Sequence, residues 1–83
     1  MYRPLPWHKF VRLFKAHGAT CSNRSGGSHY KVLGENKRSQ SVPKPSRGDV
    51  KAIYVKTLRE TLGLASMDDA EFFAPIQKAK GRK

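Results

Sequence analysis

The chain has 83 residues, of which 17 are Lys or Arg and 6 are Asp or Glu, so its formal net charge is +11. A chain this short forms one small domain with a thin core, which argues against a deep cofactor pocket. The charge predicts a polyanionic partner, most often a nucleic acid, with an acidic protein or a membrane surface as the alternatives. Basic residues recur along the whole sequence, so a basic tail alone does not account for the excess.

Cys21 is the only cysteine, which excludes an internal disulfide and is typical of a reducing compartment. One cysteine and three scattered histidines do not suit a structural zinc site. The sequence has no apolar run of membrane-spanning length and no signal-peptide pattern. We therefore expect a cytoplasmic protein without a cofactor, a metal or a membrane association.

The N-terminal segment predicts an extended lead-in followed by a helix. Pro4 and Pro6 favour the extended part, and the helix begins near Pro6 or Trp7. Large apolar residues then recur at i, i+3, i+4 and i+7, the spacing of one helical face. They are Trp7, Phe10, Val11 and Phe14. Gly18 ends the helix, because glycine adopts the left-handed conformation of a C′ residue at little cost.

The middle of the chain predicts a small antiparallel sheet. Residues 19–24 form a short strand, and the small residues 25–27 turn the chain into a second strand over residues 28–33. Residues 34–37 form a hairpin loop, and residues 38–42 return as a third strand that Pro43 ends. Helices that cover one face of this sheet would complete an α+β fold.

Side chains of the second strand alternate between the two faces of the sheet. Tyr30 and Val32 point to the face that we expect the helices to cover, and His29 and Lys31 point to the open face. Imidazole titrates near neutrality, so His29 is a candidate acid/base in a protein built to attract phosphate. The alternative is an ordinary exposed strand residue.

Candidate phosphate ligands lie near this histidine in the sequence. Three cations come from the turn, the strand and the loop after the sheet: Arg24, Lys31 and Lys44. Gly26 and Gly27 let the backbone approach a phosphate closely, and Ser28 can donate a hydrogen bond to one. Acidic residues are few and lie mostly in the C-terminal third, so we expect chemistry without Mg²⁺.

The C-terminal half predicts two further helices. A basic loop over residues 44–49 leads to a helix over residues 51–62, which Gly63 ends. Residues 66–69 resemble a capping box that opens a third helix, and Pro75 kinks or shortens that helix. Their apolar contacts are Tyr54, Val55, Leu58 and Leu62, then Phe72, Phe73 and Ile76. The basic tail after Gln77 is expected to be disordered.

An ordered set of short motifs runs along residues 6–64. It comprises the amphipathic helix ending in Gly18, then Arg24, Gly27-Ser28-His29, Val42-Pro43, Thr57-Leu58-Arg59 and Leu62-Gly63-Leu64. At this length and charge the set resembles the HicA-type mRNA interferase toxins of type II toxin–antitoxin systems. The resemblance implies a fold like that of double-stranded-RNA-binding domains, α-β-β-β-α, over residues 1–65. Residues 66–83 would then be a C-terminal helical extension with a basic tail.

The resemblance also implies a function. His29 of the Gly-Ser-His signature would be the catalytic residue of a metal-independent endoribonuclease that cleaves mRNA, and a cognate HicB-type antitoxin would cover it. Many members carry a second histidine where this chain has Lys44-Pro45-Ser46, and the segment from Asp68 onward is longer than the usual core. One alternative is therefore a non-catalytic double-stranded-RNA-binding module of the same fold. Another is a small basic protein docked by a partner through Phe72 and Phe73.

Overall fold

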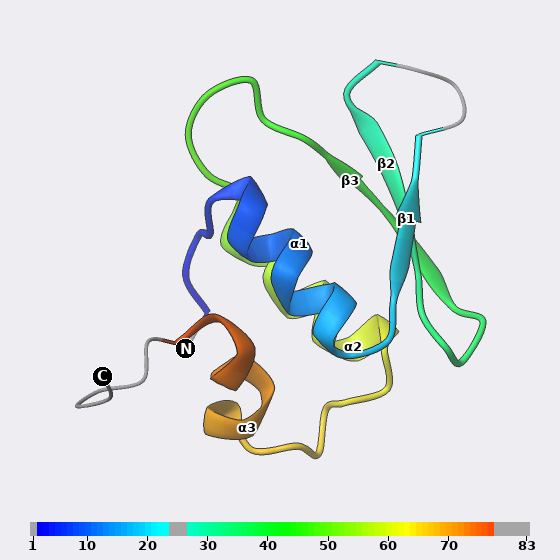
Figure 1. Cartoon of the computed structure of the whole chain (residues 1–83), viewed down its shortest axis with the longest axis vertical. Coiled ribbons are helices and arrows are strands. Elements are labelled where there is room, and N and C mark those ends of the chain that lie inside the picture. The colour runs from blue at the N-terminus through cyan, green and yellow to red at the C-terminus, as the bar shows by residue number, and fades with distance from the viewer. Residues whose placement is uncertain (1, 24–26, 78–83) are drawn as a thin grey trace.

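The computed structural model of the protein describes residues 2–23 and 27–77 (Figure 1). The elements in chain order are α1 (Trp7–Ala16), β1 (Thr20–Ser22), β2 (His29–Leu33), β3 (Ser39–Pro43), α2 (Ala52–Thr61), α3 (Asp69–Phe73) and the 3₁₀ helix η1 (Ala74–Ile76). This order confirms the expected α+β fold of one helix, three strands and a second helix, with an extra helix at the C-terminal end. Arg24, Gly26 and the basic tail lie outside the described residues.

The three strands form one antiparallel sheet in the order β1-β2-β3. Lys31 of β2 lies opposite Ser22 of β1 and Ser41 of β3, and His29 lies opposite Pro43. The helices α1 and α2 lie together on one side of this sheet, as Figure 1 shows. The other face of the sheet, which we call the open face, is the face to which His29 and Lys31 point.

The hydrophobic core lies between the sheet and the helices. Its fully buried residues include Phe10, Leu13, Phe14, Val32, Val42, Val55, Leu58 and Phe72. Leu13 was missing from the predicted stripe of the first helix, whereas Trp7 and Val11 of that stripe are only half-buried. The reason is that α1 also packs against η1. The buried residues of α1 therefore cover a wider part of its circumference than packing against the sheet alone would need.

The C-terminal extension shares this core. Phe72 of α3 is completely buried, and His17 at the end of α1 stacks on its ring with a centroid distance of 4.9 Å. The Nε2 atom of His17 also lies 2.8 Å from the Phe72 carbonyl oxygen. Phe72 is therefore not available as the exposed partner anchor considered above, and Phe73 is half-buried.

The predicted capping box at residues 66–69 does not form. The N-cap of α3 is Asp68, its side chain makes no capping hydrogen bond, and Asp69 instead forms an ion pair with Arg59 of α2. A buried guanidinium is a stronger donor than a backbone N–H, so it is the better partner for this carboxylate. Pro75 shortens the third helix as expected: α3 ends at Phe73, and the chain continues as η1, which contains Pro75.

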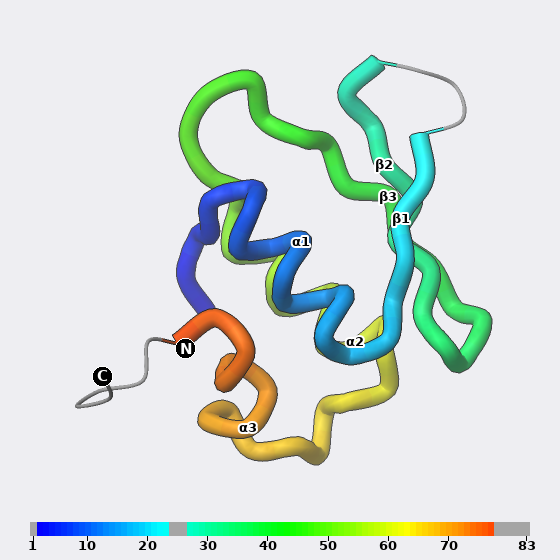
Figure 2. Tube along the Cα trace, in the orientation of Figure 1, coloured from blue at the N-terminus to red at the C-terminus, as the bar shows by residue number. Residues whose placement is uncertain are grey.

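The N-terminal segment is fixed to the loop before α2. Leu5 and Val50 form an antiparallel bridge, with backbone N–O distances of 3.0 and 2.7 Å. Residues 2–5 are therefore extended, as the two prolines predicted, and the segment starts close to η1 (Figure 2). Across residues 2–23 and 27–77, no helix has the length and apolar character needed to cross a bilayer.

Candidate nucleic-acid interface

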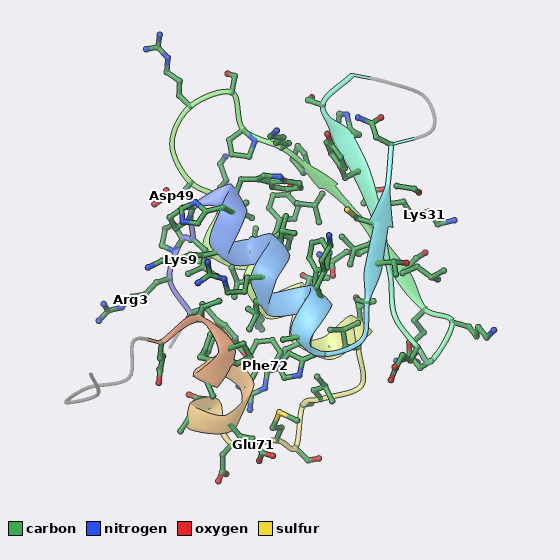
Figure 3. All side chains as sticks on the ribbon, viewed as in Figure 1. Arg3, Lys9, Lys31, Asp49, Glu71 and Phe72 are labelled. Carbon is green, nitrogen blue, oxygen red and sulfur yellow. The ribbon has the colours of Figure 1, made fainter. Side chains whose placement is uncertain are left out.

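His29 and Lys31 lie on the open face of the sheet, as their alternation predicted. His29 is the first residue of β2 and is exposed, and so is Lys31 two positions further on. Two residues of strand separate their Cα atoms by roughly 7 Å, so both side chains can reach one nucleotide and its phosphate. Figure 3 shows Lys31 pointing away from the helices.

The turn before β2 sets the position of His29. Gly27 has a φ of +73°, a left-handed conformation that a residue with a side chain adopts at a cost. The amide Nδ2 of Asn23 donates to the Gly27 carbonyl oxygen at 2.8 Å, and the Lys44 backbone N–H donates to the Ser28 carbonyl oxygen at 2.6 Å. Residues directly after β1 and β3 therefore hold the two residues that lead into His29.

Lys44 does not join His29 on the open face. Its Nζ atom lies 5.8 Å from the centre of the Trp7 ring, and that ring lies 5.1 Å from the ring of Tyr30. Tyr30 is half-buried on the helix side of the sheet, so the Lys44 ammonium group lies beside α1. The predicted ligands therefore divide into an open-face pair, His29 and Lys31, and a cation on the helix side.

Ser28 and Gly27 remain close to His29 in the chain, and both are exposed in the turn that precedes it. Arg24 and Gly26, the other two predicted residues of this loop, lie outside the described residues. Of the predicted ligands that the structure describes, only Lys31 lies on the same strand face as His29.

Small residues with hydroxyl groups lie on the two strands beside β2, and the sequence did not single them out as site residues. The exposed residues opposite β2 are Thr20, Ser22, Ser39 and Ser41. Residues 39–41 are all polar, so the sequence does not show which of them faces the helices; in the structure Gln40 turns inward, where its Nε2 atom donates to the Tyr54 carbonyl oxygen at 3.3 Å. The two serines beside it are thereby left on the open face, where hydroxyl groups suit contacts to a sugar–phosphate backbone.

The other two histidines do not belong to this surface. His17 is engaged with Phe72 at the far end of α1, and His8 is exposed on the first turn of α1. Among the side chains that the structure describes, no three of His, Cys, Asp or Glu gather closely enough to hold a metal ion. The described part of the open face therefore offers one imidazole, one ammonium group, the exposed aliphatic side chain of Leu33 and a set of hydroxyls.

Comparisons of the chain with protein-family models, with curated proteins and with solved structures give no match. The functional assignment therefore depends on the resemblance of the short motifs, on the chemistry of the open face and on the charge of the chain.

Proposed function

We propose that this protein is an endoribonuclease toxin of a type II toxin–antitoxin pair, with His29 as the acid/base residue. The observation that carries the proposal is the exposure of His29 on the open face of the sheet, next to Lys31. A catalytic imidazole must reach the ribose of its RNA substrate, and a ring packed under α1 and α2 would have no such access. The net charge of +11 supports a polyanionic substrate.

In this proposal His29 removes the proton from a ribose 2′-hydroxyl. The 2′-oxygen attacks the adjacent phosphorus, the bond from phosphorus to the 5′-oxygen breaks, and the leaving oxygen takes a proton from solvent. The products carry a 2′,3′-cyclic phosphate and a 5′-hydroxyl. Lys31 stabilises the negative charge that grows on the phosphate oxygens as the attack proceeds.

A cognate antitoxin of the HicB type is the second partner of this proposal. A protein that covers the open face would exclude RNA from His29, and acidic side chains on it would complement Lys31. The open face has no helix over it in the described chain, so a partner has direct access to the sheet (Figure 1).

One observation favours a second candidate, a non-catalytic double-stranded-RNA-binding module. The chain has Lys44-Pro45-Ser46 where many HicA-type toxins carry a second histidine, and the ammonium group of Lys44 lies over Trp7 on the helix side of the sheet. A module of this kind binds duplex RNA with a strong dependence on salt concentration and leaves it intact.

Cleavage of a matched pair of oligonucleotides distinguishes these functions. One is an all-RNA strand, and the other has the same sequence with deoxyribose throughout, which removes the proposed nucleophile. With EDTA present, the nuclease cuts only the RNA and leaves ends with a cyclic phosphate. Binding of the RNA without any cutting, under conditions where the protein is folded, would instead establish the binding module.

A further inference from the structure

A cleft of about 330 Å³ lies on the helical side of the molecule, away from the open face of the sheet. Its walls come from both ends of the described chain: the N-terminal segment, the first turns of α1, and the α3–η1 segment. The lining residues are Arg3, Leu5, Lys9, Phe73, Ile76 and Gln77. Figure 2 shows the start of the N-terminal segment close to η1 at this place.

The walls of the cleft are fixed by packing elsewhere. The bridge between Leu5 and Val50 holds the N-terminal wall, and the buried ring of Phe72 anchors the wall made by α3 and η1. The ring of Tyr2 packs edge-on against Phe73, with the centroids 6.3 Å apart, and so connects the two walls. The cleft is therefore formed before any ligand arrives, which lowers the entropic cost of binding.

The chemistry of the cleft is amphipathic. Its apolar lining consists of Leu5, Phe73 and Ile76, and its charged groups are the side chains of Arg3 and Lys9. Figure 3 shows Arg3 and Lys9 on the same side of the molecule. No acidic residue is among the six described lining residues, so the two cations are not neutralised from within the cleft. Charge complementarity thus calls for a ligand that is both apolar and anionic.

We propose that this cleft binds an acidic peptide segment of a partner protein. One large apolar side chain of the peptide enters between Leu5 and Phe73, and flanking carboxylates pair with Arg3 and Lys9. The volume of the cleft is at the lower end of the range for ligand pockets, which suits one or two side chains. The Gln77 amide offers a donor and an acceptor, the two groups that a peptide backbone needs.

A peptide fits this lining better than a strand of RNA. Two of the three apolar residues, Leu5 and Ile76, are aliphatic and offer no flat surface on which a base can stack, and the Phe73 ring already packs against Tyr2. The N-terminal segment and η1, which line the cleft, lie across α1 from the sheet (Figure 1), so an occupant of the cleft leaves His29 accessible. This proposal does not depend on the nuclease activity.

Fluorescence anisotropy with a labelled synthetic peptide tests the proposal. The peptide carries one phenylalanine flanked by glutamates, and a second peptide has serine in place of the phenylalanine. Because the whole protein is basic, the informative quantity is the difference between the two peptides. We expect the phenylalanine peptide to bind roughly tenfold more tightly than the serine peptide. Arg3→Glu or Lys9→Glu should lower the affinity for the phenylalanine peptide by about tenfold.

Lys15→Glu is the matched control, since Lys15 is an exposed residue of α1 that does not line the cleft. Lys15→Glu changes the net charge by the same amount and should lower the affinity for the phenylalanine peptide by no more than about twofold. Thermal melting checks that each variant is folded. An equal loss in Lys9→Glu, Arg3→Glu and Lys15→Glu would overturn the proposal, and so would equal affinity of the two peptides.

Competition and cleavage assays separate this site from the nuclease site. Displacement of the peptide by single-stranded RNA, in a manner that depends on Lys9, would overturn the peptide proposal in favour of a nucleic-acid ligand. Unchanged peptide affinity in His29→Ala supports two independent sites. RNA cleavage by Lys9→Glu at the wild-type rate supports the same conclusion, whereas a shared loss in both assays would contradict it.

Discussion

Arg59 of α2 and Asp69 of α3 form an ion pair with an Nη1–Oδ1 distance of 2.5 Å. Arg59 is buried, and its guanidinium also donates to the carbonyl oxygens of Leu64, at 3.1 Å, and Met67. The hydrogen bond from Arg59 holds the pKa of Asp69 below its ordinary value of 3.8, and the same bond raises the pKa of Arg59. One side chain thus fixes the connection between the second and third helices.

This pair predicts an acid-sensitive contribution to stability. Because the pKa of Asp69 is lower in the folded protein, the contribution is complete above about pH 4 and is lost as the pH falls through the folded value. Urea unfolding of wild type and Asp69→Asn at a series of pH values measures it. The variant should be less stable at pH 7, and the difference should shrink towards pH 3.

Asp68→Asn is the matched control for this experiment, because the neighbouring carboxylate makes no capping hydrogen bond. The role of the ion pair would be contradicted if the free energy of unfolding changed with pH equally in wild type and in Asp69→Asn.

Phe72 should be among the side chains most important for stability. It is completely buried, so Phe72→Ala should lower the free energy of unfolding by about 3–5 kcal/mol. Phe73 is half-buried, and Phe73→Ala should cost clearly less. Denaturant unfolding of both variants measures the difference. If Phe72→Ala costs under about 1 kcal/mol, the C-terminal segment does not belong to the core.

Gly18 should not tolerate a side chain. Its φ of +85° is left-handed, and an added Cβ would lie 2.4 Å from the Cδ atom of Glu35. Gly18→Ala should therefore cost about 1–2 kcal/mol from backbone strain. The contact should add little, because Glu35 is an exposed, flexible side chain that can move away. In a Glu35→Ala background the cost should therefore stay nearly the same, and a much smaller cost there would show that the contact dominates.

The order of the elements was predictable from local sequence patterns. The apolar spacing of the first helix, the alternation around His29 and the glycines that end the helices all depend on residues close in the chain. The buried state of Arg59 was not predictable in this way, because its partners belong to the connection after α2 and to α3. A local motif assigned Asp69 to a capping box, and a tertiary ion pair overrode it.

The candidate site was also predictable only where it depends on local sequence patterns. Strand alternation puts His29 and Lys31 on the open face, and both are exposed there. The position of the Lys44 side chain depends on Trp7, which is 37 positions earlier in the chain. The closeness of Lys44 to His29 in the sequence therefore did not predict that the two side chains share a face. The serines of β3 became recognisable only once Gln40 was seen to bond to α2.

Lys31 and Lys44 should therefore differ in their effect on RNA cleavage. Lys31 shares a strand face with His29, so Lys31→Ala should lower kcat/KM by roughly tenfold through the loss of a charged contact to phosphate. Lys44 lies over Trp7, and Lys44→Ala should lower kcat/KM by no more than about twofold. Steady-state cleavage of one RNA substrate by both variants compares them. The reverse order of effects would place the phosphate on the helix side.

The most direct test of His29 as the acid/base residue is the rate of RNA cleavage, in EDTA, by wild type, His29→Ala and His8→Ala. His8 is the matched control, since it is an exposed histidine on α1 outside the open face. We expect His29→Ala to cleave at least about 100-fold more slowly while still binding RNA, and His8→Ala to cleave like wild type. Wild-type cleavage by a folded His29→Ala variant would contradict this role of His29.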